Sequence, residues 1–567
     1  MNATSLLALL LAACGSGPDG GDGTGAPDGG APDGGSADGG TPDGGSTDGG
    51  TPDGGSTDGG TTDGGTTDGG TTDDTGTGLL APELELGATT TLPVPTAVGL
   101  PVVTGFTVNA RIHGHGQPCT WQVDHGPTEA LGTTAEPRAL PPTLDAWLRE
   151  DWTEGTNGWL AGIGGAQLSH QASGGPDGGP FVRYTDDGTA GNDTNHLDGI
   201  GIIHLGLYGY TGHFDDGGVP ALYMGGGFPD LRGARFTMDL RGVDWVANGT
   251  TLGTWIQGYR DISVTEVVPE DSRYPNWAWT AGGLSEHLAS GDWERAEWTL
   301  RSRSEDWTFA GANGGRLLYD YGELDSLLSH VNVDLFPIQI LDVDLSAPPR
   351  GAIDYDALTI QYRQHSLTAP GNGGSLLSEP AGGTGAALLT DGWRNGEGHE
   401  WWSAEAPEGD QEFVYAFAAP VTLYSLTVHN AVTWPSDQVV LEVSPDGGAT
   451  WERVGGGSLP LRNAYGPNFL FVHESTWTKI GGVNHWSPLY ADPVDRLRVT
   501  VRSGHQPERW GLGEIEAFGT GAVQQTEDDW TDVNQDVLVE PGTWYHQVTA
   551  RCTGGEVVGP IEEVVVP

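Results

Sequence analysis

The sequence predicts an all-β protein built from several β-sandwich domains behind a disordered, Asp- and Gly-rich N-terminal segment. Glycine makes up 94 of the 567 residues, and abundant glycine with few helix-forming residues favours strands and turns. Runs such as Phe236-Thr-Met238-Asp-Leu240 alternate with a period of two between Gly or Asp residues, as half-buried strands do. The 21 tryptophans suit sandwich cores and also ring-stacking binding faces. The length allows roughly three or four domains of about 150 residues each.

The charge of the chain argues against two classes of partner. There are 77 acidic and 24 basic residues, which gives a formal net charge of -53. Nucleic-acid binders need clustered Lys and Arg, and so do proteins that adsorb to an anionic bilayer. Lys479 is the single lysine. We therefore expect no nucleic-acid partner and contact with a membrane only through an anchor.

The first residues carry a candidate export and anchoring signal. A short apolar run, Leu6 to Leu11, leads into Ala12-Ala13-Cys14. This order resembles the lipobox of bacterial lipoproteins, in which cleavage precedes the cysteine and the cysteine is acylated. The resemblance implies a signal peptide at 1–14, lipidation of Cys14 and a lipid-anchored place in the bacterial cell envelope, at the outer membrane or cell surface. The run lacks a preceding Lys or Arg, so an apolar end without export function is the alternative.

Residues 15–79 are predicted to be a disordered linker. They repeat a five-residue unit, x-x-Asp-Gly-Gly, without aromatic or basic residues. Such a segment cannot bury enough apolar surface to offset its chain entropy, and its regular aspartates repel one another. Calcium-binding nonapeptide repeats need a period of nine and an apolar position. A tether is therefore the favoured interpretation.

Two distant stretches resemble the two halves of one fibronectin type III domain. The motif Trp121-x-Val-x-x-Gly126, within "CTWQVDHG", is similar to strand C of that family, and "PGTWYHQVTARC", which ends at Cys552, is similar to its strand F. The resemblance implies one split domain, 80–145 with 525–567, into which everything between is inserted. Domain insertion is tolerated at exposed loops.

The same resemblance implies a disulfide bond. Strands C and F are antiparallel neighbours in this fold, with Cys119 opening the one and Cys552 closing the other. An exported protein meets an oxidising environment, where such a pair is stable. Two unrelated thiols are the alternative.

Residues 146–366 combine strand-like runs with one candidate short helix, "LLYDYGELDSLLSHV". The order of these runs and the closing "IDYDALTI" resemble laminin-B-like and galactose-binding-like jelly rolls. His204, His213, Asp215 and Asp216 lie close in sequence, but their spacing matches no standard metal site. The acidic "TDDGTAGNDTNHLDG" likewise lacks the spacing of a calcium loop. We therefore interpret both as surface loops.

Residues 370–520 resemble the discoidin domain, also called the factor V/VIII type C domain. The runs "LLTDGW", "FVYAFAAPVTLYSLTVHN", "RLRVTVRSG" and "ERWGLGEIEAFG" follow that family in order and spacing. The resemblance implies a jelly roll of eight strands that binds glycans, lipid head groups or proteins. It also implies a structural Ca²⁺ with Asp391 and Glu514 as ligands, since Ca²⁺ takes oxygen donors. A turn aspartate and a surface glutamate without a metal are the alternative.

The segment "SPDGGATW", Ser444 to Trp451, fits the Asp-box pattern of sialidases. Asp boxes recur on several propeller blades and carry no catalysis, whereas this chain has one copy. Asp446-Gly447 suits a tight turn between two strands. A hairpin turn is therefore favoured over a sialidase.

The candidate ligand face lies on loops of 370–520, because aromatic rings stack on sugars while polar groups hold hydroxyls. One loop carries two adjacent tryptophans beside Glu405. Alternation sends one of the two inward, so a core position for either is the alternative. A long insertion, "HESTWTKIGGVNHWSPLY", carries the rest. The candidate ligand-binding residues are Trp401, Trp402, His473, Trp477, Asn484, His485 and Trp486.

These features predict a surface-anchored, non-catalytic binding or adhesion lipoprotein that presents modules for carbohydrates or cell-surface proteins. No Gly-x-Ser-x-Gly, His-Glu-x-x-His or phosphate-loop motif is present. Abundant carboxylates leave open a glycoside- or polysaccharide-cleaving enzyme with its site in 146–366. A structural envelope protein is the third alternative.

Overall fold

The computed structural model describes residues 79–92, 104–186, 199–202, 230–257, 276–309, 324–329, 334–341, 346–461, 469–520 and 529–567, with short gaps at 142–143, 145, 154, 157–158, 160–167, 364–365, 395–397, 474–476 and 481–482. All of these residues belong to one unit, 74–567. The fold is all-β, as predicted, with several antiparallel sheets. Among the described residues, α2 (Leu324–Leu328) is the one α-helix, and it lies within the predicted helical segment. Short 3-10 helices span Leu284–Leu288, Ser304–Asp306, Pro370–Asn372 and Ala386–Thr390.

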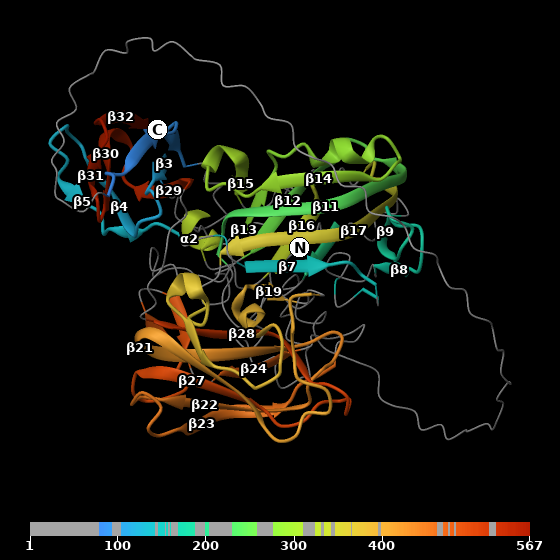
Figure 1. Ribbon diagram of the computed structural model, residues 1–567. Coiled ribbons are helices and arrows are strands. Elements are labelled where there is room, and N and C mark those ends of the chain that lie inside the picture. Colours follow the sequence, from blue (N-terminus) through green and yellow to red (C-terminus); the bar gives the residue numbers. More distant parts are fainter. Residues whose placement is uncertain are drawn as a thin grey trace, which may run out of the picture. The chain divides into compact units, whose positions relative to one another are not determined.

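The first sandwich combines strands from both ends of the described chain (Figure 1, blue and red). One sheet has β3 at its centre and contains β1 (Glu83–Leu86), β2 (Thr90–Thr91), β3 (Gly105–His113) and β29 (Trp530–Leu538). The other has the order β31-β30-β4-β5, with β32 on β30 and β6 on β4. Its strands are β4 (Cys119–Gly126), β5 (Thr133–Thr134), β6 (Arg138–Ala139), β30 (Gly542–Cys552), β31 (Gly555–Val558) and β32 (Glu562–Val566).

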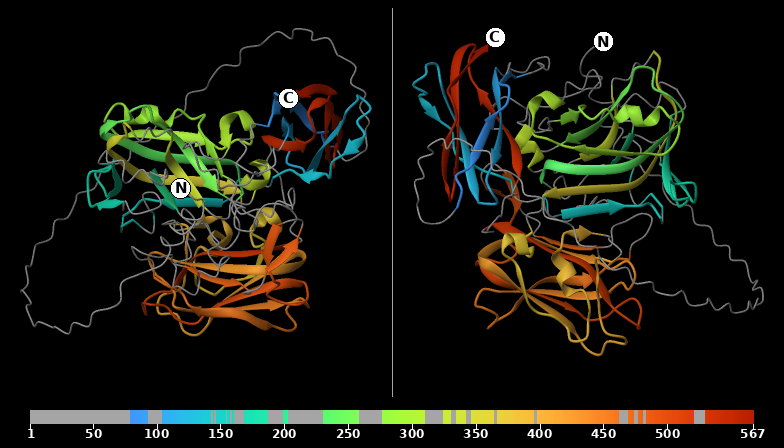
Figure 2. Two further views of the ribbon diagram at one scale, coloured as in Figure 1. Left: turned by 180° about the vertical axis from the view of Figure 1, so that it is seen from behind. Right: turned by 45° about the horizontal axis from the view of Figure 1, so that its top comes forward.

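The split of this sandwich is closed by β4 and β30. The two strands are antiparallel, and Cys119 lies opposite Cys552 in their register. These two cysteines form the predicted disulfide, with Cα atoms 4.2 Å apart and 433 residues between them in sequence. Buried side chains from both halves share one core, for example Phe106, Trp121 and Val548. The interleaving of the two ends is visible from other directions in Figure 2.

The second sandwich is built from two sheets of residues 146–363, to which residues 393–394 add one short strand. A seven-stranded sheet has the order β14-β11-β17-β7-β19, with β9 on β17 and β8 on β9. Its strands are β7 (Ala146–Glu150), β8 (Ser169–Gln171), β9 (Phe181–Asp186), β11 (Asp230–Val246), β14 (Glu294–Thr299), β17 (Arg350–Arg363) and the later β19 (Trp393–Arg394). A five-stranded sheet has the order β10-β16-β12-β13-β15, with β10 (Gly199–Ile202), β12 (Thr251–Gln257), β13 (Asn276–Trp279), β15 (Trp307–Phe309) and β16 (Asp334–Leu341).

Aromatic residues and one buried ion-pair group hold this second sandwich together. Phe236 on β11 stacks on Trp298 of β14, with ring centroids 5.2 Å apart. Asp354 on β17 is fully buried and accepts hydrogen bonds from Arg183 and Arg241. Two guanidinium groups thereby balance one buried carboxylate, so Asp354 serves the fold.

The third sandwich comprises an eight-stranded sheet with the order β20-β28-β21-β27-β22-β23, and β18 and β24 also pair with β21. The long β21 passes from one layer to the other: its first half pairs with β27 and its second half with β28, with a register shift between Ala416 and Val421. The strands are β18 (Ser375–Ser378), β20 (Trp401–Trp402), β21 (Gln411–Asn430), β22 (Gln438–Ser444), β23 (Glu452–Ser458), β24 (Phe469–His473), β27 (Val494–Val501) and β28 (Gly511–Thr520), beside a separate hairpin of β25 (Trp477–Ile480) and β26 (Val483–Trp486).

Within the described part of the chain, no helix has the length and apolar character needed to cross a membrane.

Candidate functional site

Three half-buried tryptophans gather at one end of the third sandwich. Trp402 ends β20, Trp434 lies in the connection from β21 to β22, and Trp510 directly precedes β28. Ser403 donates its backbone N–H to the Trp510 carbonyl at 2.8 Å, and its hydroxyl accepts the Trp510 N–H at 3.0 Å. We call Trp402, Trp434 and Trp510 the tryptophan end.

The loop that carries Trp434 is fixed by Asn430 and by backbone bridges. The Asn430 side chain accepts the Ser436 N–H at 2.7 Å and donates to the Ser436 carbonyl at 2.8 Å. Pro435 bridges to Gly511, and Ser436 bridges to Gly504. Loops from three separate parts of the sequence are thereby held together, which pre-organises the surface they carry.

Glycine at 504 allows Trp510 to lie close to the backbone. A Cβ at Gly504 would be 2.3 Å from Cδ1 of the Trp510 ring, so any other residue would displace that ring. Trp510 also packs against the core of the third sandwich, which leaves part of its ring exposed and holds the rest. An aromatic ring fixed in this way loses little entropy when a ligand stacks on it.

Glu400 fixes the orientation of the Trp402 side chain through a hydrogen bond. Its carboxylate is buried, and Oε2 accepts the indole N–H of Trp402 at 3.0 Å. Its other oxygen, Oε1, accepts the backbone N–H of Val432, which joins the loop of Trp434. Glu400 therefore orients one ring and ties two of the three loops.

A polar rim borders the tryptophan end. Arg509 donates from Nη2 to Glu405 Oε1 at 3.0 Å, and the carboxylate is largely exposed. His505 is exposed and lies 2.9 Å, through Nε2, from the Leu459 carbonyl. Partly exposed aromatic residues beside charged and hydrogen-bonding groups are the usual make-up of a carbohydrate or small-ligand site.

The structure separates the two adjacent tryptophans, as strand alternation predicts. Trp402 is half-buried, whereas Trp401 is fully buried and packs edge-on against Phe413 at 4.7 Å. Trp401 cannot meet a ligand, so its prediction as a ligand-binding residue is wrong and the core alternative holds. The sequence reasoning missed Trp434, Trp510 and Arg509. The signal available for them was an aromatic residue next to Pro or Gly in a loop, which is weak by itself.

The predicted insertion residues lie outside what the structure describes at the level of side chains. Only the backbone register of the hairpin is described: Trp477 is opposite Trp486, Thr478 opposite His485, and Lys479 opposite Asn484. His473 closes β24 opposite Ser425. Their ligand-binding roles stay predictions, and Cys14 and the His204 to Asp216 segment lie outside the described residues altogether.

Of the two predicted calcium ligands, Asp391 lies in the turn after the 3-10 helix Ala386–Thr390, and Glu514 lies on β28, which contacts that turn. Glu514 is buried, and its Oε1 accepts the backbone N–H of Gly392, the residue after Asp391, at 3.1 Å. The Asp391 carboxylate accepts the Trp393 N–H at 2.9 Å and lies 2.8 Å from His399 Nδ1. Burial raises the pKa of Asp391, and the hydrogen bonds from His399 and Trp393 oppose that shift. The two carboxylates supply the oxygen donors that Ca²⁺ takes, so the donor chemistry fits this ion.

The Asp-box-like segment is a hairpin turn between β22 and β23. Asp446 accepts the Thr450 N–H at 2.8 Å and its hydroxyl at 2.7 Å. The ring of Trp451 lies under the guanidinium of Arg498, 4.3 Å from the ring centroid. The segment thus satisfies its own polar groups and serves the hairpin.

Comparison with known proteins matches one region of the chain to solved β-sandwich modules. A CBM32 module from a family 31 glycoside hydrolase of Clostridium perfringens is 14% identical and covers 28% of this chain and 96% of its own, with a TM-score of 0.20. A CBM32 module of the same organism, solved in complex with GalNAc-β-1,3-galactose, is 13% identical and covers 27% and 99%, with a TM-score of 0.20. An F5/8 type C domain from Bacteroides fragilis is 15% identical and covers 25% and 82%, with a TM-score of 0.17. No protein-family model and no curated protein matches the chain. One region thus resembles CBM32 and F5/8 type C modules.

Proposed function

We propose that the third sandwich binds glycans at the tryptophan end and that the chain is a non-catalytic binding lipoprotein of the bacterial cell envelope. The observation that carries this proposal is the convergence of Trp402, Trp434 and Trp510 on three hydrogen-bonded loops. A sugar ring offers C–H groups to an aromatic face and hydroxyls to neighbouring polar groups. The tryptophan end and its rim offer both kinds of partner.

The state of the nearby carboxylates supports binding without cleavage. A glycosidase needs one carboxylic acid and one carboxylate flanking the scissile bond. Glu400 is buried, and its oxygens accept hydrogen bonds from Trp402 and Val432. Glu405 is paired with Arg509 at the rim. Glu400 thereby positions Trp402, and Glu405 forms an ion pair with Arg509.

The remaining parts of the proposal come from the sequence. Lipidation at Cys14 would anchor the protein, and the acidic repeat of 15–79 would hold the sandwiches away from the membrane. The ligands would be glycans or glycan-bearing proteins of a cell surface. Asp391 and Glu514 would hold a structural Ca²⁺, which has no catalytic role in this proposal.

A glycan array probed with the full chain, followed by reducing-end assays on every hit, tests this function. We expect retention of at least one glycan class with no release of reducing ends. Release of reducing ends would assign an enzyme, with 146–366 as the first place to search for its site. Absence of both binding and cleavage would favour a structural envelope protein.

A further inference from the structure

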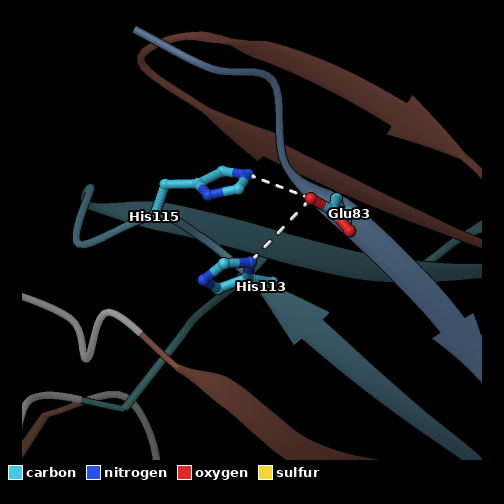
Figure 3. Close-up of side chains that lie close together, drawn as sticks. All are labelled: Glu83, His113 and His115. Atoms are coloured by element: carbon cyan, nitrogen blue, oxygen red, sulfur yellow. Dashed lines mark ion pairs between the residues drawn. The ribbon is translucent and has the colours of Figure 1, made fainter. Parts of the chain in front are cut away.

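A cluster of two imidazoles and one carboxylate lies in the first sandwich and shares no residue with the tryptophan end. Glu83 Oε1 is 3.6 Å from His115 Nε2 and 4.0 Å from His113 Nδ1 (Figure 3). The imidazole rings of the two histidines are 4.0 Å apart between centroids. Within the described residues, this is the only group of three or more His, Cys, Asp or Glu side chains whose ligand atoms all lie within 4.8 Å of one another.

The strand register and a tight turn bring the three side chains together. Glu83 on β1 is directly opposite His113, the last residue of β3, and opposed residues share one face of a sheet. His115 follows two residues later in the left-handed region, at φ 52°, and Gly116 continues there at φ 69°. Residues other than glycine are uncommon in this region, and Asn, Asp and His occur there more often than the rest. The sequence thus holds a histidine at a conformation for which glycine would be less strained.

The turn is fixed against the disulfide. A Cβ at Gly114, between the two histidines, would lie 2.8 Å from Cys119 Sγ, so only glycine lets the turn approach the cystine this closely. Gln117 Nε2 donates to the Leu80 carbonyl at 2.9 Å, which ties the turn to the chain just before β1. His113 also stacks on Trp530 of β29, at 5.6 Å between centroids. The cluster is therefore held by rigid surroundings on several sides, as a pre-organised site needs to be.

The charges beside the cluster allow a cation. Arg111 is the nearest basic residue along β3, and its guanidinium is 3.4 Å from Glu85 and 3.5 Å from Asp532. Two carboxylates therefore balance its charge. The Glu83 side chain is 59% exposed, whereas those of His113 and His115 are 20% and 15% exposed. An ion can thus enter from the side of Glu83 and meet two more enclosed imidazoles.

The donor set selects the class of ion. Two imidazole nitrogens and one carboxylate oxygen are a common zinc ligand set, in which a water molecule takes the fourth position. Ligands of a tetrahedral zinc, at about 2.0–2.1 Å from the metal, lie about 3.3 Å from one another. Glu83 Oε1 is 3.6 Å and 4.0 Å from the two histidine nitrogens, and all three ligand atoms lie within 4.8 Å of one another, so binding of zinc requires the three side chains to contract around the ion. The exposed Glu83 side chain is free to make its part of that movement. Ca²⁺ and Mg²⁺ take oxygen ligands and are poorly matched to two imidazoles.

We propose that Glu83, His113 and His115 bind one Zn²⁺ ion, which fastens β1 to β3 near the start of the part of the chain that the structure describes. Strand β1 has only four residues with which to pair with β3. The ion would add a cross-link between these two strands. Zinc binding of this kind stabilises the fold, because the site exists only in the folded state.

Calorimetric titration of the full chain with ZnCl₂ alone tests the proposal. We expect one zinc per chain at the strongest site. Glu83→Gln and His115→Asn should each lower the zinc affinity of that site by more than about tenfold. Mutation of a residue that merely hydrogen-bonds to a metal ligand already lowers metal affinity by about that factor. Asn is chosen at 115 because it accepts the left-handed backbone. His287→Gln is the matched control, because it alters another half-buried His–Glu pair, in which His287 Nδ1 is 3.4 Å from Glu294 Oε2.

A second readout separates loss of the site from loss of the fold. In EDTA, both variants should unfold at the temperature of the unchanged protein, and excess Zn²⁺ should raise that temperature only in the unchanged protein and in His287→Gln. Ca²⁺ at the same concentration should not reproduce the effect at this cluster. Zinc binding that is absent in the unchanged protein, or that both site variants retain at full strength, would overturn the proposal.

Discussion

At the scale of single residues, Asp356 on β17 lowers the stability of the folded state by an amount that depends on pH. Burial raises the pKa of its carboxyl to about 7, and Asp177, Asp239 and Asp151 add to the shift, while a hydrogen bond from the Ala357 N–H opposes it. In the unfolded chain the group ionises near pH 4. Between about pH 4 and pH 7 the folded state therefore holds the proton that the unfolded state has lost, and stability falls as the pH rises.

We predict that Asp356→Asn stabilises the protein above pH 7 and has little effect near pH 4. The gain is bounded by about 4 kcal/mol, since each pKa unit corresponds to about 1.4 kcal/mol. Thermal unfolding across this pH range measures it. Asp437→Asn is the control with the opposite sign, because the hydrogen bond from Ser458 lowers the pKa of Asp437. An Asp356→Asn variant that is destabilised equally at both ends of the range would contradict this account.

Trp401 and Trp402 show what residue-level sequence reasoning can and cannot supply. The period of a strand predicts that one ring points inward and one outward. It does not predict which, because that depends on where β28, more than a hundred residues later, pairs with β20. The buried ring is Trp401, and the candidate ligand face keeps Trp402.

At the scale of elements, the proposed calcium site would join the turn at Asp391 to strand β28. Glu514 on β28 accepts the Gly392 N–H, so the two elements are in contact. We predict that Ca²⁺ raises the unfolding temperature of the chain by a few degrees and that chelation by EGTA reverses the rise, because an ion bound by the native state alone stabilises it. Differential scanning calorimetry measures the effect.

Glu514→Gln tests the same site, with Glu442→Gln as a control on another strand of the third sandwich. The first should abolish the calcium response and the second should leave it unchanged. A response that persists in Glu514→Gln would place the ion elsewhere, for example in the acidic repeat.

Elements were predicted well where a local pattern decides them and poorly where distant pairing does. The alternating run in β11 and the hairpin after Ser444 were readable from the sequence. The passage of β21 between two layers was not, because it depends on partners in β27 and β28. Trp434 and Trp510 of the tryptophan end were missed for the same reason: the three loops lie far apart in sequence, and hydrogen bonds of the folded state unite them.

At the scale of the whole molecule, one disulfide closes a sandwich whose halves are separated by two others. Removing a native disulfide from a small domain costs about 2–5 kcal/mol. We predict that the double variant Cys119→Ser with Cys552→Ser shows faster amide hydrogen exchange in β4 and β30, since exchange reports local opening. Strand β27 of the third sandwich is the internal control and should keep its protection. Equal exchange in β4 and β30 with and without the bond would contradict the role assigned to it.

The split itself was predictable because its two halves carry complementary strand motifs and one cysteine each. The zinc cluster was not, although "HGH" is visible in the sequence, because Glu83 joins it only through the register of β1 and β3. Contacts implied by resemblance to a known family could thus be predicted from the sequence. Contacts that depend on the strand register of this particular chain could be found only in the structure.

The most direct test of the proposed function is the affinity of the strongest glycan from the array for defined tryptophan variants. By titration calorimetry, Trp402→Ala and Trp510→Ala should each bind at least about tenfold more weakly, a loss of about 1.4 kcal/mol. Trp451→Ala is the matched control, since this half-exposed ring lies beyond the opposite end of β22, and it should bind within about twofold of the unchanged protein, as expected for a surface residue outside the site. Full affinity in both tryptophan-end variants would contradict the assignment of the tryptophan end as the glycan site.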